Sequence, residues 1–297
     1  MDYVKNRTAI LIVMLIMFGF TIAAYSQVIP KPDHVVIVIE ENHASHQIIG
    51  SQKATYINKL ATEGALFINA HGVSHPSQPN YIALYSGSIQ GVTDDGCLKG
   101  KTPFTTPNLG HELISKGFTF GGYSEYMPKE GFTGCGVGKS IFKHGSPVYA
   151  RKHNPWVDWQ GNKKNGVPAS VNKTLKSFPK DFSKLPTVSI VIPDEDNDMH
   201  NGPDPATIKR GDKWLKTHMS SYIKWARKHN SLFILTYDED NDTPANHIPT
   251  LFVGQMVRHG KFKEYINHYS VLRTIEDMYG LGHAGDATNK AITGIWE

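Results

Sequence analysis

The sequence is poor in cysteine, has no long block of like charge and lacks the glycine-rich signatures of nucleotide-binding proteins. Its 297 residues carry a formal net charge of +4, without the runs of basic residues that bind nucleic acid. The two cysteines, Cys97 and Cys135, do not have the CxxC spacing of a zinc or redox pair. No GxxxxGK[ST] motif is present, which excludes a P-loop nucleotidase, and the absence of GxSxG disfavours an α/β-hydrolase.

The N-terminal residues have the composition of an export signal. Two basic residues precede an apolar run over 9–20, and small residues follow up to Ser26, which is the order of a secretory signal peptide. We therefore expect 1–26 to be a cleaved signal and 27–297 to be one secreted or periplasmic domain without a stable membrane span. An uncleaved membrane anchor is the alternative, because the apolar run is slightly long for a signal.

Export places the two cysteines in an oxidising compartment. A disulfide between Cys97 and Cys135 is therefore predicted, and it would close a loop of about 38 residues with several kcal/mol of stabilisation in the chain-entropy model. Two buried free thiols are the alternative.

Apolar, β-branched segments alternate with helical patterns along the chain. The apolar segments are 34–40, 65–70, 118–124, 187–193, 231–237 and 248–254. Helical patterns cover 53–63, 107–116, 206–229 and 266–279. Continuous hydrophobicity indicates strands buried on both faces, so we predict an α/β fold with a mostly parallel central sheet and helices on both faces. Residues of about 125–185 break this rhythm and are predicted to be an inserted cap or lid.

Acidic, amide and histidine residues follow four of the apolar segments. They occur at 41–43, 71–81, 194–200 and 238–242. Since the carboxyl ends of parallel strands share one edge of a sheet, we expect these groups to meet there. Carboxylates packed together repel one another unless a cation neutralises them. The pattern therefore predicts a divalent metal site, with His75, His200 and His247 as further ligands or proton carriers.

Each of these groups taken singly has a simpler interpretation. Glu41 or Asn42 alone is more often an ordinary loop residue at a strand end, and the acidic residues of 194–198 are more often a solvated turn. The run at 238–242 lacks the glycine and closing glutamate of a calcium loop, so an EF-hand is not expected. His153 and His268 have no distinctive context and are not assigned to the site.

The segment HPSQPNY holds Ser77 between two prolines. Each proline fixes its own φ at about −65° and restricts the residue before it, so Ser77 is predicted in a rigid turn before a helix. One interpretation is a helix N-cap. The other is a nucleophile with the helix amides aimed at phosphoryl oxygens. Beside a metal site this favours ester hydrolysis at phosphorus, with a metal-activated serine and a histidine that protonates the leaving alcohol.

Four motifs, in order, resemble the bacterial phosphoesterase family of secreted acid phosphatases and phosphatidylcholine-type phospholipases C, within the alkaline phosphatase superfamily. They are EENH at 40–43, HPSQPNYIALYSG at 75–87, PDEDNDMHNG at 193–202, and TYDED at 236–240 followed by NHIPTLFVG at 246–254. The likeness covers roughly residues 33–280. It implies an alkaline-phosphatase-like fold and a divalent metal cofactor.

The resemblance also implies which residues bind the metal. The family's Glu-Asn pair and its late acidic pair, together with the nucleophile, fall on Glu41, Asn42, Ser77, Asp238 and Glu239. Two-zinc members of the superfamily use an Asp-x₃-His pair for a second ion. Here both Asp196 with His200 and Asp194 with Asp198 have that spacing, so one or two ions are expected.

The same comparison implies a catalytic group. Ser77 aligns with the attacking threonine of the Thr-Phe-Pro-Asn motif in related nucleotide phosphodiesterases, which makes it the expected nucleophile, with Ser74 as the alternative. Asn80 and Asp198 are expected to contact the substrate, Asp198 also as a partner beside His200. The histidines expected to bind phosphate and transfer protons are His75, His200 and His247.

We predict a secreted, metal-dependent acid phosphatase that hydrolyses phosphate monoesters through a phosphoserine intermediate. The strings GYSEYMP and YARKHNPW look like those of small secreted acid phosphatases. Phospholipase C or phosphodiesterase activity is the first alternative, and a non-catalytic, metal-stabilised binding protein is the second. A sulfatase is disfavoured because Tyr81 stands where its maturation motif needs arginine. The expected substrate is a small phosphorylated molecule, with a phospholipid headgroup as the alternative.

Overall fold

The computed structural model describes residues 28–285 and 289–297. The predicted signal peptide at 1–26 lies outside the described residues. Among the helices of the described residues, none is both long enough and apolar enough to cross a membrane.

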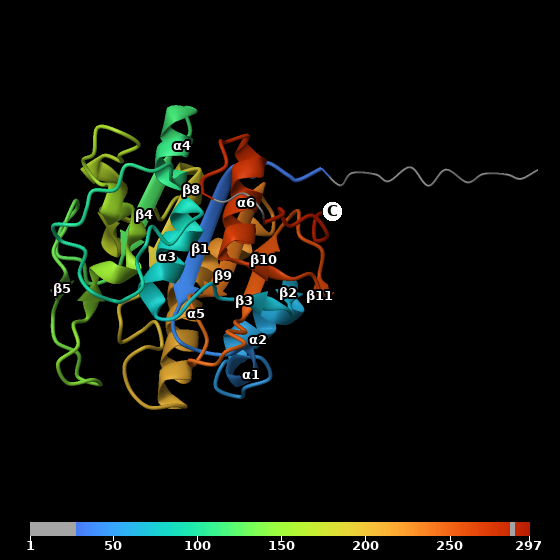
Figure 1. Ribbon diagram of the computed structural model, residues 1–297. Helices are drawn as coiled ribbons and strands as arrows, with labels where there is room; N and C mark the ends of the chain where they lie inside the picture. Colours follow the sequence, from blue (N-terminus) through green and yellow to red (C-terminus); the bar gives the residue numbers. More distant parts are fainter. Residues whose placement is uncertain (1–27, 286–288) are drawn as a thin grey trace, which may run out of the picture.

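An eight-stranded sheet forms the centre of the molecule (Figure 1). Its order is β11-β2-β10-β9-β1-β8-β4-β7. The strands are β1 (His34–Glu40), β2 (Ala65–Phe67), β4 (Phe120–Ser124), β7 (Asn172–Thr174), β8 (Val188–Ile192), β9 (Ser231–Tyr237), β10 (Thr250–Gly254) and β11 (Gly260–Phe262). Only β10 of these eight runs antiparallel to its neighbours, because no helix intervenes to return the chain after β9. The predicted mostly parallel sheet is confirmed.

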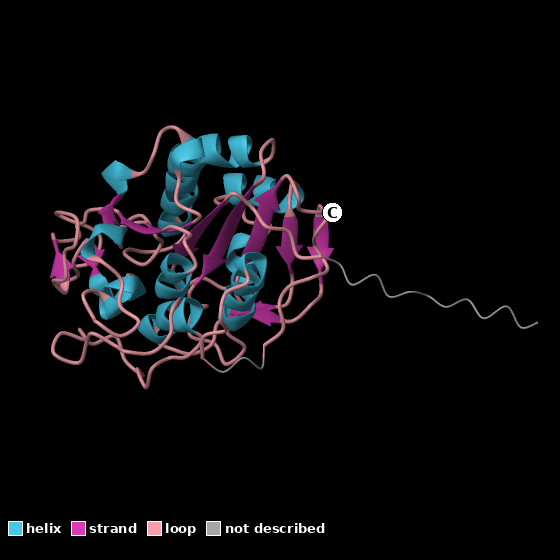
Figure 2. Ribbon diagram, turned by 90° about the horizontal axis from the view of Figure 1, so that it is seen from above, coloured by secondary structure: helices cyan, strands magenta, loops and turns pink. Residues whose placement is uncertain are grey.

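Helices cover both faces of the sheet (Figure 2). One face carries α2 (Thr55–Thr62) and α5 (Ala206–Ala226), which pack together, and the other carries α3 (Ser77–Ser86), α4 (Leu109–Ser115) and α6 (His268–Tyr279). A single turn, α1 (Ser45–Ile48), follows β1. Because both faces are covered, all of β1 beyond its first residue is buried, which explains its continuous apolar run.

Residues 125–185, predicted to be an inserted cap or lid, contribute both to the main sheet and to a separate hairpin. They contain the hairpin of β5 (Gly136–Val137) with β6 (Tyr149–Ala150), and they supply β7 at the sheet edge. Five short 3₁₀ helices complete the segment: η1 (Arg151–His153), η2 (Pro155–Trp159), η3 (Ala169–Val171), η4 (Leu175–Ser177) and η5 (Phe182–Lys184). Trp156 and Trp159 of η2 are fully buried. A second small pair, β3 (Ala70–His71) with β12 (Ile266–Asn267), lies apart from the main sheet.

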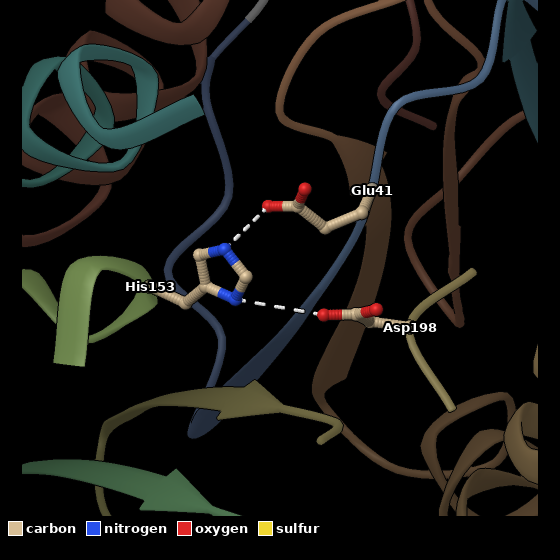
Figure 3. Close-up of side chains that lie close together, drawn as sticks. All are labelled: Glu41, His153 and Asp198. Carbon is tan, nitrogen blue, oxygen red and sulfur yellow. Dashed lines mark ion pairs between the residues drawn. The ribbon is translucent and has the colours of Figure 1, made fainter. Parts of the chain in front are cut away.

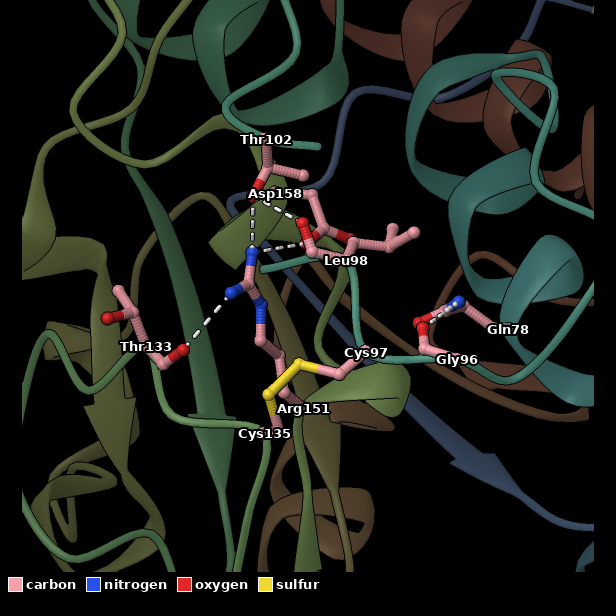
Figure 4. Close-up of a disulfide and its surroundings, with 9 residues drawn as sticks. All are labelled: Gln78, Gly96, Cys97, Leu98, Thr102, Thr133, Cys135, Arg151 and Asp158. Carbon is pink, nitrogen blue, oxygen red and sulfur yellow. Dashed lines mark hydrogen bonds and ion pairs between the residues drawn. A yellow bond between two sulfur atoms is a disulfide. The ribbon is translucent and has the colours of Figure 1, made fainter. Parts of the chain in front are cut away.

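A disulfide joins Cys97 to Cys135, as predicted. Figure 4 shows it beside Arg151 and Gln78. The Arg151 amide donates to the Cys135 carbonyl at 3.0 Å, and the Gln78 side chain donates to the Gly96 carbonyl at 3.0 Å. The bond therefore ties the loop next to α3 to the base of the β5–β6 hairpin.

We expect the double variant Cys97→Ser/Cys135→Ser to unfold more easily than the oxidised protein. The bond spans 38 residues, for which the chain-entropy model gives about 4 kcal/mol. Urea unfolding of both proteins would measure the difference. Reducing agent should lower the midpoint of the wild-type protein alone, and equal midpoints under oxidising conditions would contradict the expectation.

Candidate active site

The site lies at the carboxyl ends of the central strands, where β1 is flanked by β8 and β9. In the register of β1 with β9, Glu40 lies opposite Tyr237. Glu41 and Asp238 are the next residues of these two parallel strands, so they leave the sheet side by side. Two hydrogen bonds hold this junction: the Asp238 amide donates to the Glu40 carbonyl at 3.0 Å, and the Asn42 amide donates to Asp238 Oδ1 at 3.0 Å.

Ser77 is the first residue of α3 and is only 2% exposed. Pro76 occupies the N-cap position, so the interpretation of Ser77 as the N-cap is wrong. The Ser77 hydroxyl is free to face the acidic residues instead. Its Oγ lies 3.2 Å from Glu41 Oε2 and 3.1 Å from Glu239 Oε1. A serine at a helix N-terminus between two carboxylates is positioned to meet an anion once those carboxylates are neutralised.

Asn80 fixes the loop that presents Ser77. Its Oδ1 accepts from the amides of Val73 and Ser74 at 2.8 and 3.0 Å, and its Nδ2 donates to the carbonyls of Ser74 and Pro76 at 2.8 and 3.2 Å. All four hydrogen-bonding positions of the amide are therefore used. The structure gives Asn80 a bracing position, and it leaves no polar group of this side chain for the substrate contact expected from the sequence.

Three carboxylates crowd around Ser77 and the end of β1. Burial raises the pKa of Asp238 well above its usual value, and the charges of Glu41 and Glu239 raise it further. Burial and Glu41 raise the pKa of Glu239 to about 7, although hydrogen bonds from His75 and Ser77 oppose the shift. Asp238 Oδ2 is buried without a hydrogen-bond partner among the described residues. A divalent cation would satisfy this oxygen and neutralise the cluster, so the residues fit a metal.

His153 lies in this site, although no sequence signal assigned it there. Figure 3 shows its ring between two carboxylates: Nε2 is 2.8 Å from Glu41 Oε1, and Nδ1 is 3.5 Å from Asp198 Oδ2. The ring also stacks on Tyr81 at 4.8 Å between centroids. Burial would raise the pKa of Glu41, but the charge and hydrogen bond of His153 hold it well below its usual value.

Glu41, His153 and Asp198 form a group that could hold a metal ion, with ligand atoms within 4.8 Å of one another. Glu41 belongs to this group and also lies beside Asp238 and Glu239, the acidic pair after β9. His153 follows Glu41 by more than a hundred residues and sits in a 3₁₀ turn, so no periodic pattern marks it. The nearest sequence signal is the string RKHNPW, which stands out only by its clustered rings and charges.

The three predicted histidines are placed differently. His75 Nδ1 lies 2.5 Å from Glu239 Oε2, and hydrogen bonds to Thr243 and Glu239 raise its pKa against the effect of burial. His200 Nδ1 faces Asn201 Oδ1 at 2.9 Å, and burial lowers its pKa.

His247 does not line the pocket in front of Ser77. Its ring stacks on His71, with centroids 5.3 Å apart, and only its backbone amide reaches the site loop, where it donates to Asp240. The structure thus brings His75 and His200 to the site but not the His247 ring. His268 was not assigned to the site from the sequence. It holds the backbone of the site, because its Nε2–H donates to the Asp238 carbonyl at 2.6 Å.

The loop after β8 contains both candidate pairs for a second ion, Asp196 with His200 and Asp194 with Asp198. Asp194 Oδ1 accepts from the amides of Asp196 and Asn197, and Asp196 accepts from the Ser140 hydroxyl and the Asn201 amide group. Both aspartates are therefore used in holding the loop. Asp198 is buried against Glu41, whose backbone amide donates to the Asp198 carbonyl at 2.8 Å.

A pocket of about 650 Å³ opens in front of Ser77, lined also by Asn42, His75, His200 and Glu239. A second pocket of about 390 Å³ shares His200 and Asp95 with it.

Lys152 lines the second pocket and places a cation beside the first. Its Nζ lies 2.8 Å from Asp95 Oδ2, and the charges of Glu41 and Asp95 outweigh burial and raise its pKa. A cavity of about 640 Å³ near Tyr126 and Leu175 contains none of the residues that surround Ser77. The candidate site therefore consists of the two pockets that share His200 and Asp95.

The chain is similar to named phosphatases over most of its length. The chain is 45% identical to the phosphatidylinositol-3-phosphatase of Mycobacterium tuberculosis over 272 residues, which cover 90% of this chain and 84% of that protein. It is 29% identical to an acid phosphatase of Aspergillus fumigatus over 76% of this chain and 51% of that protein. The chain thus spans about half the length of the fungal relative.

Structural similarity extends the comparison to the fold. A protein of the alkaline phosphatase superfamily from Vibrio parahaemolyticus matches with a TM-score of 0.57 at 14% identity, over 90% of this chain and 72% of that chain. The family model described as Phosphoesterase family matches residues 51–282. This chain therefore belongs to the phosphoesterase family and has an alkaline-phosphatase-like fold.

Proposed function

We propose that this chain is an exported, metal-dependent phosphatase that hydrolyses phosphate monoesters, with Ser77 as the nucleophile. The observation that carries the proposal is the position of Ser77 Oγ at the start of α3, within 3.2 Å of the carboxylates of Glu41 and Glu239. The relatives named as acid phosphatase and phosphatidylinositol-3-phosphatase support it. Export is supported by the disulfide and by the signal-like residues at 1–26.

The metal-binding role is assigned to the residues that follow β1 and β9. The predicted ligands are Glu41, Asn42, Ser77, Asp238 and Glu239. The neighbouring group of Glu41, His153 and Asp198 offers ligands for a second ion. A divalent cation bound there supplies Lewis acidity, which lowers the pKa of the nearby hydroxyl and neutralises charge on the phosphoryl group.

The chain's own residues then account for the remaining steps. The Ser77 hydroxyl, with its pKa lowered, loses its proton to solvent, and Oγ attacks phosphorus in line as the bond to the leaving oxygen breaks. The N-terminal amides of α3 orient the phosphoryl oxygens. His75 and His200 line the same pocket and donate protons or hydrogen bonds to the leaving alcohol and the phosphate. Water then attacks the phosphoserine, which releases inorganic phosphate and restores Ser77.

Replacing Ser77 by alanine should abolish turnover. We expect Ser77→Ala to lower kcat for p-nitrophenyl phosphate by roughly 10³-fold or more, because removal of a nucleophile leaves only positioning and electrostatics. Ser74→Ala is the matched control, since the Ser74 hydroxyl donates to the His75 carbonyl at 3.1 Å and should change kcat little. Full activity in Ser77→Ala, or an equal loss in Ser74→Ala, would contradict the assignment.

Removal of the metal should abolish turnover without unfolding the protein. We expect dialysis against EDTA to remove both bound divalent metal and activity, and Asp238→Asn to bind metal more weakly. Asp181→Asn is the control, because Asp181 is exposed at the N-cap of η5, away from the residues around Ser77. Metal content by plasma emission spectroscopy, circular dichroism and phosphatase rate would be compared. If the EDTA-treated protein kept full activity without bound metal, the proposed metal-binding role of the strand-end carboxylates would be wrong.

His153 is expected to support metal binding beside Glu41 and Asp198. His153→Gln should weaken metal binding and lower kcat by roughly tenfold or more, because the variant loses a group that binds or orients at the metal site. His218→Gln, at an exposed position of α5, is the matched control. A purely structural role predicts a lower melting temperature with unchanged metal affinity, which would contradict the assignment.

A panel of three substrates would test the type of ester. We expect the phosphomonoester to be hydrolysed much faster than bis-p-nitrophenyl phosphate or phosphatidylcholine. Preference for the diester would favour a phosphodiesterase, and preference for phosphatidylcholine would favour a phospholipase C. Failure to hydrolyse any of the three by metal-loaded protein would favour the non-catalytic binding protein.

A further inference from the structure

The loop 138–148, which joins β5 to β6, has a well-defined conformation at its tip. The Ser140 amide donates to the Ser146 carbonyl at 3.0 Å. Ser140 Oγ accepts from the amides of Phe142 and Lys143, each at 3.0 Å, and donates to Asp196 Oδ1 at 2.5 Å. One serine therefore closes the turn and fastens it to the loop after β8. The side chain of Ile141, next to this anchor, is held outward.

The tip of this loop combines apolar and basic side chains. Ile141 is 85% exposed, the largest exposed fraction among the large hydrophobic side chains of the described residues, and Phe142 is 44% exposed. Lys139 and Lys143 flank this pair and are themselves exposed. A single exposed isoleucine is ordinary on a protein surface, but an apolar pair between two cations combines the apolar burial and the charge attraction that hold peripheral proteins on anionic lipid.

The same loop forms a wall of the candidate active site. Lys143 lines the pocket that also contains Lys152 and His200, and His200 lines the pocket in front of Ser77. The Arg210 guanidinium lies 4.0 Å above the Phe142 ring. Figure 1 shows the green chain next to β5 extending toward the lower end of the molecule, where β1 ends. The apolar tip and the opening of the site thus belong to one end of the protein.

We propose that the loop 138–148 docks this enzyme on an anionic lipid surface, with Ile141 entering the interface and Lys139 and Lys143 facing lipid phosphates. The proposal rests on the proposed function, because docking would bring the pocket in front of Ser77 to phosphate monoesters at that surface. Charge complementarity supports this occupant, because Lys139 and Lys143 are exposed and residues 138–148 contain no acidic side chain.

Docking of this kind is weak and reversible. One inserted isoleucine and two lysines provide much less affinity than a membrane span, and anionic lipid supplies an attraction that salt screens. The loop would therefore concentrate the enzyme at a surface and orient the pocket toward headgroups. It would have no effect on a small substrate in solution, which reaches Ser77 without the surface.

Vesicle binding separates this role from catalysis. The full protein, Ile141→Asp and Lys139→Glu would be sedimented with vesicles of phosphatidylcholine alone or with added phosphatidylserine, and assayed on p-nitrophenyl phosphate. The matched controls are Ile114→Asp, at a partly exposed isoleucine of α4, and Lys216→Glu, at an exposed lysine of α5. Unfolding midpoints would confirm that each variant is folded.

We expect wild-type protein to bind the phosphatidylserine vesicles, with binding that decreases as salt increases. Each loop variant should lose roughly fivefold or more of this binding, while both controls bind like wild type and all proteins hydrolyse p-nitrophenyl phosphate equally. No binding by wild type, or equal binding by Ile141→Asp and wild type, would overturn the proposal. Vesicle binding by a protein without phosphatase activity would instead overturn the proposed function and leave the docking role intact.

Discussion

The crowding of buried carboxylates at the end of β1 is the constraint on which the rest of the site depends. Glu41, Asp198 and Asp238 are all buried within one small region, and burial strongly disfavours three negative charges there. The protein offsets part of this cost with His153, placed between Glu41 and Asp198 (Figure 3). The unpartnered oxygen of Asp238 marks where a cation would offset more of it. Functional sites commonly keep such unfavourable arrangements, because the same strong local field stabilises a charged reaction centre.

The scaffold holds this arrangement through connections that do not themselves take part in the chemistry. Asn80 uses its whole amide to brace the loop before α3, and His268 holds the backbone of Asp238 from beneath. The disulfide connects the chain next to Gln78 with the hairpin that leads into His153 (Figure 4). These ties join three distant parts of the sequence around Ser77. Precise placement of reacting groups depends on such supporting contacts.

Local sequence patterns were sufficient for most of the sheet and helices, because strand and helix periodicities are short-range. The runs at 34–40 and 231–237 became β1 and β9 with the predicted bounds. The antiparallel direction of β10 and the inclusion of β7 in the sheet could not be read in this way, since pairing partners are chosen by the whole chain. His247 illustrates the same limit: its backbone amide lies at the site loop, but its ring stacks on His71 and does not line the pocket in front of Ser77.

The sequence by itself determined the parallel core, the family motifs, the disulfide and the strand-end position of the acidic residues. These follow from hydrophobic periodicity, from motif order and from the rule that parallel strands end at one edge. Only the tertiary structure decided that Ser77 begins α3 after a proline N-cap, that Asn80 braces the loop before α3, and that His153 lies between Glu41 and Asp198. The physical reason is that side-chain direction depends on packing between segments far apart in the chain, and no local pattern encodes it.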